Sequence, residues 1–415
     1  MTDAAARGRL LLLVPATSYR IGDFLKAAER LDVDVAVGSD QPGVLEKFSH
    51  GRTVTVDFKT VARGVEQIAS YNDRYPLAAI IGIDQETTLL AARASALLGL
   101  RHNAPASVEA TGNKYRFRIR MANSGLPAPW FTLLSLADDP ASQAGRMPYP
   151  VVMKPLALSA SRGVIRADNP QQFVAAFARI RAILEMTDSR GEAADHILAE
   201  DYIPGREVAL EGLLENGDLR VLALFDKPDP LDGPYFEESL YITPSRLTAP
   251  LQADIAMTVG QAVATLGLRE GPIHAELRIN DKGIWLIEVA ARSIGGLCSR
   301  ALEFGAGERL EDLIIRHALG LSAGTDSAEH PASGVMMIPI PAAGALRLVS
   351  GLEAARTVPG IQDVTISIPL GDVLVPVPEG NRYLGFIFAV GATPMAVEVA
   401  LRQAHGKLQF QIDAD

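Results

Sequence analysis

The chain has 415 residues, of which 48% are hydrophobic and 21% charged, and its formal net charge is -10 at pH 7. Such a length predicts two to four structural units with ordinary globular packing. Proteins that bind nucleic acids usually carry a basic surplus, and a membrane span needs ~20 consecutive apolar residues. The sequence offers neither feature, so small-molecule chemistry is favoured, with no nucleic-acid and no membrane partner.

Apolar runs alternate with helical patterns over residues 1–110. The expected strands cover residues 10–14, 33–37, 53–56 and 78–83, and the expected helices cover residues 21–31 and 87–98. Buried strands that alternate with helices predict an open parallel sheet. The turn at residues 15–19 lacks the GxGxxG pattern of a dinucleotide site. This region is therefore expected to be a Rossmann-like scaffold domain rather than an NAD domain.

From residue 111 the pattern changes to mixed helices and antiparallel strands. The expected helices cover residues 114–121 and 173–184, and the expected strands cover residues 130–134 and 151–153. Strands 207–214 and 219–225 flank Asn216-Gly217, which is a strong hairpin signal. A second hairpin is expected from strands 273–280 and 284–290. The fold class is thus a combination of α/β and α+β.

The last part of the chain has an order of its own, βαββαβ. Its expected strands cover residues 335–340, 364–368, 384–390 and 408–412, with helices at residues 351–358 and 395–405. This order suits a small split-βαβ subdomain over residues 326–415.

The chain contains one cysteine, Cys298, so no intrachain disulfide can form and an oxidising compartment is not indicated. The apolar run at residues 10–14 is shorter than the ~7–15 residues of a signal-peptide core. A cytoplasmic location is therefore expected.

Two carboxylates in the second hairpin have the spacing of a metal site. If residues 281–283 form a three-residue loop with Gly283 in the left-handed position, Glu276 lies directly opposite Glu288. Like charges at that separation are destabilising unless a cation lies between them, and Mg²⁺ prefers carboxylate oxygens. A two-residue loop would shift the register by one and break the pairing. The alternative is an ordinary acidic surface of an antiparallel sheet.

Two further segments favour binding of a nucleotide. Lys154 ends a short apolar strand and is followed by the small, polar loop at residues 159–163, whose backbone N–H groups could approach phosphate. The strand at residues 197–201 ends in acidic residues that could accept hydrogen bonds from a ribose. Taken alone, the loop is weak evidence because most loops of this composition are only turns, and the alternative for the strand end is a solvated surface.

The order of these segments resembles the ATP-grasp superfamily, and in particular its carboxylate–amine ligase branch with the dipeptide-forming L-amino acid ligases. The segments 199–207 (AEDYIPGRE) and 286–292 (LIEVAAR) are the most specific, and 225–228 (FDKP) and 233–238 (GPYFEE) are typical of the dipeptide-forming branch. The resemblance covers essentially the whole chain. It implies an N-terminal Rossmann-like domain (1–110), an ATP-grasp domain (111–325, with lobes 111–195 and 196–325) and a C-terminal subdomain (326–415).

The resemblance also implies residues that bind ATP. In the phosphate region they are Lys114, Lys154, Ser159, Ser161, Arg162 and Gly163, and around the adenosine they are Glu200, Asp201, Tyr202, Ile203 and Glu207. Lys227 would face the nucleotide or the transferred phosphate. Glu276 and Glu288 would ligate Mg²⁺.

For the chemical step, the resemblance implies Arg292 and the backbone N–H groups near Gly295 and Gly296, which would stabilise the acyl phosphate and the tetrahedral intermediate. Two further residues each have two interpretations, a contact with substrate or an ordinary structural role. His274 could touch substrate or be a structural histidine, and Glu238 could receive an ammonium or be a solvated acid. One departure from the family pattern is Ala290, where an asparagine that ligates metal is common.

The expected enzyme activates a carboxylate with ATP as an acyl phosphate, joins it to an amine, and releases ADP and phosphate. An L-amino acid is the expected substrate, and a homodimer is implied by the resemblance alone. One alternative is an ATP-grasp carboxylase or purine-pathway-type ligase, which would share the ATP residues. Another is an ATP-binding protein without turnover, although simple binding would not require Arg292.

Overall fold

The structure is a computed structural model that describes residues 8–16, 18–41, 50–304, 307–321 and 331–414. Thr17, in the turn predicted at residues 15–19, and the predicted boundary at 325/326 lie outside the described residues. The boundaries at 110/111 and 195/196 stay predictions. Among the helices of the described chain, none has the length and hydropathy needed to cross a bilayer.

The N-terminal part is a four-stranded parallel sheet in the order β3-β2-β1-β4, as the sequence predicted. The strands are β1 (Arg9–Leu13), β2 (Val35–Ser39), β3 (Thr53–Thr55) and β4 (Leu77–Gly82), and the helices are α1 (Ile21–Arg30), α2 (Val61–Asn72) and α3 (Gln85–Leu98). Leu10 and Leu12 pack in one core with α1, and Leu11 and Leu13 in another with α2 and α3. The sequence analysis had missed α2.

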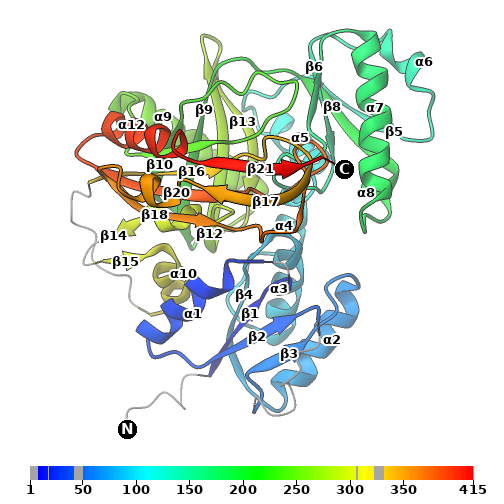
Figure 1. Ribbon diagram of the computed structural model, residues 1–415. Coiled ribbons are helices and arrows are strands. Elements are labelled where there is room, and N and C mark those ends of the chain that lie inside the picture. Colours follow the sequence, from blue (N-terminus) through cyan, green and yellow to red (C-terminus); the bar gives the residue numbers. More distant parts are fainter. Residues whose placement is uncertain (1–7, 17, 42–49, 305–306, 322–330, 415) are drawn as a thin grey trace.

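A second, antiparallel sheet has the order β5-β8-β6-β7 and forms the first lobe of the middle region. Its elements are β5 (Phe131–Ser135), β6 (Val151–Pro155), β7 (Ile165–Ala167), β8 (His196–Asp201), α6 (Pro140–Ala144), α7 (Pro170–Glu185) and α8 (Glu192–Asp195). The apolar face of α7 packs on this sheet through Phe173, Phe177 and Ile180. In Figure 1 the lobe stands apart from the N-terminal sheet, at the upper right. Two helices, α4 (Pro105–Thr111) and α5 (Lys114–Ala122), precede it along the chain.

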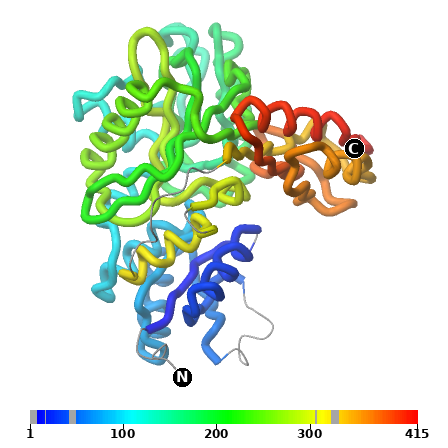
Figure 2. Tube along the Cα trace, turned by 90° about the vertical axis from the view of Figure 1, so that its left-hand side faces the viewer, coloured from blue at the N-terminus to red at the C-terminus, as the bar shows by residue number. Residues whose placement is uncertain are grey.

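The largest sheet has eight strands in the order β13-β12-β9-β10-β11-β16-β20-β18. Its strands are β9 (Arg206–Glu215), β10 (Asp218–Lys227), β11 (Leu240–Thr243), β12 (Gly271–Asn280), β13 (Gly283–Ala290), β16 (Ala332–Ile338), β18 (Ile361–Ile366) and β20 (Gly385–Gly391). The hairpin predicted at Asn216-Gly217 is confirmed, and both residues have positive φ, 55° and 98°. Three strands of the C-terminal region, β16, β18 and β20, thus extend the sheet of the second lobe, and Figure 2 shows the C-terminal region beside that lobe.

The C-terminal region has two strands more than the predicted βαββαβ order, β17 (Gly344–Ser350) and β19 (Val373–Leu374). Strand β17 pairs with β19 and with β21 (Gln409–Asp413) in a three-stranded sheet. The predicted helices correspond to α11 (Leu352–Arg356) and α12 (Pro394–His405). The sequence analysis missed β17 because two of its side chains, Arg347 and Leu348, are exposed and weaken the apolar alternation.

The two faces of the eight-stranded sheet are covered differently. Helix α9 (Ala249–Leu266) packs on the face that carries Val208, Leu210 and Ala275. On the opposite face, Ala209 and Phe225 share a core with residues of the N-terminal sheet, α1 and α10 (Leu310–Ala318). Polar side chains on this second face therefore project between the lobes and the N-terminal domain.

Candidate active site

A cavity of about 560 Å³ lies where the N-terminal domain, both lobes and the C-terminal region meet. Most of the residues predicted from the sequence line it: Lys114, Lys154, Ser159, Ser161, Glu200, Asp201, Tyr202, Ile203, Glu207, Glu238, His274, Glu276, Glu288, Arg292, Gly295 and Gly296. Three predicted residues, Arg162, Gly163 and Lys227, are absent from its lining. The volume is within the ~300–1,000 Å³ range of small-molecule sites.

Glu276 and Glu288 lie directly opposite each other on β12 and β13, as predicted, but the expected loop was wrong. The turn has two residues, Asp281 and Lys282, because Asn280 pairs with Gly283. With that register alone, Glu276 would lie opposite Ile287 instead of Glu288. A β-bulge at Ile287 adds one residue to β13 and restores the pairing of the two carboxylates.

The pleat of four neighbouring strands, β13, β12, β9 and β10, gathers charged side chains on one face in parallel rows. One row crosses the sheet from Arg278 through Glu207 to Lys227, and the next contains the pair Glu288 and Glu276. Both rows project toward the cavity, because the alternate residues of these strands form the core under α9. The polar site is thus a direct consequence of strand alternation.

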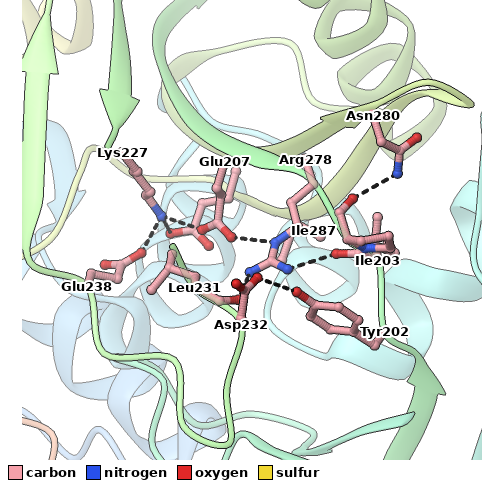
Figure 3. Close-up of polar contacts among 12 residues, drawn as sticks. Tyr202, Ile203, Glu207, Lys227, Leu231, Asp232, Glu238, Arg278, Asn280 and Ile287 are labelled. Carbon is pink, nitrogen blue, oxygen red and sulfur yellow. Dashed lines mark hydrogen bonds and ion pairs between the residues drawn. The ribbon is translucent and has the colours of Figure 1, made fainter. Parts of the chain in front are cut away.

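Lys227 lies among carboxylates (Figure 3) and is itself absent from the cavity lining. Its Nζ donates to Glu207 Oε1 at 2.8 Å and to Glu238, and it is 3.3 Å from Glu276 Oε1. Burial alone would lower the pKa of Lys227, but the three carboxylates together raise it well above its usual range. This lysine is therefore a fixed positive charge that holds the acidic cluster together.

Glu207, predicted to take the ribose, already has a cation on each carboxylate oxygen. Lys227 binds its Oε1, and Arg278 Nε donates to Oε2 at 2.7 Å. Arg278 also donates to the backbone carbonyl of Ile203 at 2.8 Å, as Figure 3 shows. An ionised carboxylate has about four lone-pair positions, so Glu207 keeps acceptor capacity for a ligand. Its ribose role stays a prediction.

Two groups of carboxylates could hold a cation. Ligand atoms of Glu207, Glu238 and Glu276 lie within 4.8 Å of one another, but the Lys227 ammonium already contacts all three. The opposed pair Glu276 and Glu288 borders the cavity and offers hard oxygen donors of the kind that Mg²⁺ prefers. We therefore regard the second group as the better fit for Mg²⁺.

Glu238 lines the cavity, yet its carboxylate is already engaged. It accepts hydrogen bonds from Lys227 and, at 2.9 Å, from the Tyr241 hydroxyl. Burial is the main reason that its pKa rises to about 7, and the nearby charge of Glu276 adds to this rise. The group predicted to receive a substrate ammonium thus already holds an ammonium of the protein.

Lys154 and Glu200 form a buried ion pair at the floor of the cavity. Lys154 Nζ is 2.6 Å from Glu200 Oε1, and Arg118 binds the same carboxylate at 2.5 and 3.1 Å. Burial alone would raise the pKa of Glu200, but Arg118 and Lys154 outweigh it and lower the pKa to about 2. Lys154 is therefore paired with a carboxylate of the protein, and its contact with phosphate stays a prediction. Burial lowers the pKa of Lys154 itself, despite Glu200.

Residues 159–163, here termed the phosphate loop, cover one side of the cavity. Ala160, Ser161 and Gly163 have φ values of 54°, 53° and 71°, in the left-handed region. Lys114 supports the loop from below, because its Nζ donates to the carbonyl of Leu158 at 2.7 Å and is 3.5 Å from Glu288. Ser159 and Ser161 face the cavity, whereas Arg162 and Gly163 bond to the C-terminal region.

His274 has a carboxylate partner at each ring nitrogen. Its Nδ1 contacts Glu211, and its Nε2 is 3.3 Å from Glu276. Burial would lower the pKa of His274, but Glu211 and then Glu276 raise it to about 9. These contacts favour the structural interpretation over a substrate contact, although the residue lines the cavity wall.

The segment that carries Arg292, Gly295 and Gly296 is anchored from two sides. Glu211 Oε2 accepts from the N–H of Ile294 at 3.0 Å. From the N-terminal domain, Arg20 donates to the Ser293 hydroxyl at 2.7 Å. This anchoring holds the backbone N–H groups near Gly295 and Gly296 at the cavity, where the prediction requires them. Their catalytic role remains a prediction.

Several residues that line the cavity were not predicted from the sequence and come from distant parts of the chain: Tyr19, Arg20, Asp84, Gln85, Glu86, Asn381, Arg382 and Tyr383. None belongs to a recognisable motif, so no local signal could have identified them. Arg118, which binds Glu200, lies in the basic helix predicted at residues 114–121, so its helix was predicted but its role was not.

Two family models match separate parts of the chain. A family model described as ATP-grasp domain matches residues 147–301, and one described as L-amino acid ligase C-terminal domain 2 matches residues 336–413. The fold is similar to that of an L-amino acid ligase from Bacillus licheniformis, with a TM-score of 0.85, 24% identity, and coverage of 98% of this chain and 100% of the other.

Two named enzymes are similar in sequence. Dapdiamide A synthase from Enterobacter agglomerans is 29% identical over 186 residues, which cover 44% of this chain and 43% of the synthase. Alanine–anticapsin ligase from Bacillus amyloliquefaciens is 23% identical over 312 residues, which cover 71% of this chain and 66% of the ligase. The matched region thus spans less than two thirds of each of these two enzymes.

Proposed function

We propose, for a chain that belongs to the ATP-grasp amino-acid ligase family, that it joins the carboxylate of one L-amino acid to the amine of a second. The observation that carries this proposal is one cavity that combines the opposed carboxylates Glu276 and Glu288 with the cations Lys114, Lys154 and Arg292. ATP and Mg²⁺ are the proposed cosubstrate and metal.

In the proposed first step, an oxygen of the substrate carboxylate attacks the γ-phosphorus of ATP, and the bond to ADP breaks. Glu276 and Glu288 would hold Mg²⁺, which when bound neutralises phosphate charge and aligns the triphosphate. Lys114 and Lys154 would neutralise the remaining charge on the phosphates. Because a phosphate would share Lys154 with Glu200, binding of ATP would favour the charged form of this lysine.

In the second step, the amine attacks the acyl carbon, the bond to phosphate breaks, and the amine loses its proton. Negative charge develops on the acyl oxygen at this stage. The Arg292 guanidinium and the backbone N–H groups near Gly295 and Gly296 would stabilise this charge. Donors that are fixed in advance, as the contacts of Arg20 and Glu211 to this segment indicate, avoid the cost of reorganisation.

The test is ATP-dependent release of phosphate in the presence of Mg²⁺, with single amino acids and with pairs, and with mass detection of the products. A ligase gives release with a pair and a product whose mass equals the two amino acids minus water. Release with bicarbonate alone would point to the carboxylase alternative. Binding of ATP with no release under any condition would support the non-catalytic alternative.

We further propose that the enzyme acts in the cytoplasm and forms a homodimer. The single cysteine supports the first statement, since a reducing compartment imposes no need for disulfides. The second rests on the family resemblance, and light scattering of the purified protein would test it.

A further inference from the structure

Residues 376–383, here termed the C-terminal turn, connect β19 with β20 and reach the phosphate loop. The N–H of Gly163 donates to the carbonyl of Pro378 at 2.8 Å. Arg162 Nε donates to the carbonyl of Glu379, also at 2.8 Å. The two phosphate-loop residues that do not line the cavity are therefore the two that bind the C-terminal turn.

The phosphate loop requires such support. Ala160 and Ser161 have positive φ, which side chains other than glycine rarely adopt, and conformations of this kind persist only where surrounding contacts hold them. The carbonyls of Pro378 and Glu379 supply two of those contacts from outside the lobe. The shape of the phosphate loop thus depends on the position of the C-terminal turn.

The position of the turn is fixed by an ion pair with the first lobe. Arg179, on α7, binds both carboxylate oxygens of Glu379, with Nε at 2.5 Å and one terminal nitrogen at 2.9 Å. Two parallel bonds define a direction as well as a distance. The pair is partly exposed, with 41% and 29% of the two side chains accessible, so its value for overall stability is small. Its effect is to orient the turn.

The same turn continues into the cavity. Asn381, Arg382 and Tyr383 line the cavity directly after the residues that hold the phosphate loop. The turn is tight: the N–H of Gly380 donates to the carbonyl of Pro376 at 2.9 Å, and a Cβ on Gly380 would lie 1.8 Å from the carbonyl oxygen of Val375. Because the segment between the two contact sites is short and tightly turned, we expect a displacement at one end to displace the other.

We propose that Glu379 is a positioning residue that, through the C-terminal turn, couples closure of the phosphate loop over ATP to occupancy of the part of the cavity lined by residues 381–383. A substrate that contacts residues 381–383 would hold the turn in place, and the turn would hold the phosphate loop closed. The coupling prevents hydrolysis of ATP when no amine is present. The role of Glu379 in closing the phosphate loop rests on the proposed function in one respect: ATP is taken to be the ligand that the loop covers.

The test compares Glu379→Gln and Arg179→Gln with the charge swap Arg179→Glu/Glu379→Arg. Each single variant should weaken equilibrium binding of Mg-ATP about fivefold, the upper end for an exposed pair, and leave the melting temperature unchanged. Each should also release more ADP per amide formed, because closure no longer depends on substrate. The charge swap should restore at least half of the lost affinity for Mg-ATP and remove at least half of the excess release of ADP.

A matched control is Asp413→Asn, which breaks an exposed ion pair of 2.7 Å with Arg347 elsewhere in the C-terminal region. This variant should change neither the binding of Mg-ATP nor the amount of ADP released per amide. Wild-type binding of ATP and wild-type ADP per amide in Glu379→Gln would overturn the proposal, and so would a charge swap as impaired as the single variants. If the wild-type protein forms no amide, the proposed function fails, whereas the binding measurement with ATP still decides the role of Glu379.

Discussion

Glu276 and Glu288 face each other across β12 and β13 because a two-residue turn and a one-residue bulge at Ile287 offset each other. The bulge increases the local twist of β13 and turns its carboxylate toward the cavity. Lys227 lies 3.3 Å from the first carboxylate, and Lys114 lies 3.5 Å from the second. Each carboxylate of the pair thus lies beside a lysine from another element.

Replacing either carboxylate should abolish most of the activity and leave the fold intact. Glu276→Gln and Glu288→Gln each remove a charged ligand from the proposed Mg²⁺ site, and kcat should fall by about 10²–10³. Phosphate release at increasing Mg²⁺ concentration measures this loss. Asp281→Asn, in the turn of the same hairpin and exposed, is the matched control and should behave as wild type. Full activity of both glutamine variants would show that this hairpin does not hold the catalytic metal.

The guanidinium of Arg292 should matter more for the chemical step than for binding. Arg292→Lys keeps the charge but loses the planar fork that can contact two oxygens, so kcat should fall about a hundredfold while the KM for ATP changes little. Steady-state kinetics with saturating amino acids separate the two parameters. Arg300→Lys, whose arginine pairs with Asp23 at 2.8 Å and does not line the cavity, should retain kcat. A change in KM alone would place Arg292 in ATP binding.

Glu200→Gln should destabilise the protein strongly at neutral pH. The change leaves Arg118 and Lys154 buried without their shared carboxylate, which costs about 3–5 kcal/mol. Urea unfolding measures the loss. Glu353→Gln removes an acid that is 87% exposed and should cause no measurable change.

The stability difference between wild type and Glu200→Gln should depend on pH. In the folded protein the pKa of Glu200 is lowered to about 2 from its ordinary value of 4.5. Between these values the unfolded state binds more protons, so the stabilisation by Glu200 is complete above pH 4.5 and is lost as the pH falls toward 2. Between pH 6 and pH 3.5, the difference in unfolding free energy between the two proteins should become smaller by about 1.4 kcal/mol, for the one pH unit below 4.5. A constant difference over this range would contradict the lowered pKa.

Ala290→Asn should not create a better metal site. Ala290 is fully buried and lies opposite His274 in the hairpin, and it does not line the cavity. The larger side chain would displace His274 from Glu276 and cost about 1–3 kcal/mol through overpacking. Thermal unfolding and the Mg²⁺ dependence of phosphate release test this. If the variant reached half-maximal phosphate release at a lower Mg²⁺ concentration and kept its stability, the side chain at position 290 would be shown to reach the metal.

Local sequence patterns were enough to predict much of the fold. The hairpin at Asn216-Gly217 and the parallel sheet that begins with β1 depend on turn chemistry and on the spacing of apolar side chains, which act over a few residues. The same holds for the charged face of β12, because alternation alone puts Glu276 on the same side as Arg278. These features can be read from short windows of the chain.

Long-range partners had to come from the tertiary structure. Glu200 is held by Arg118, 82 residues away, Ser293 by Arg20, 273 residues away, and Glu379 by Arg179, 200 residues away. The bulge that aligns Glu288 with Glu276 is also a property of how β13 packs, since the turn alone gives the wrong register. The sequence by itself thus determined which chemical groups are present and which face of each strand they occupy. Their partners and their distances were decided only by packing, because contacts between remote segments depend on the whole arrangement and leave no local pattern.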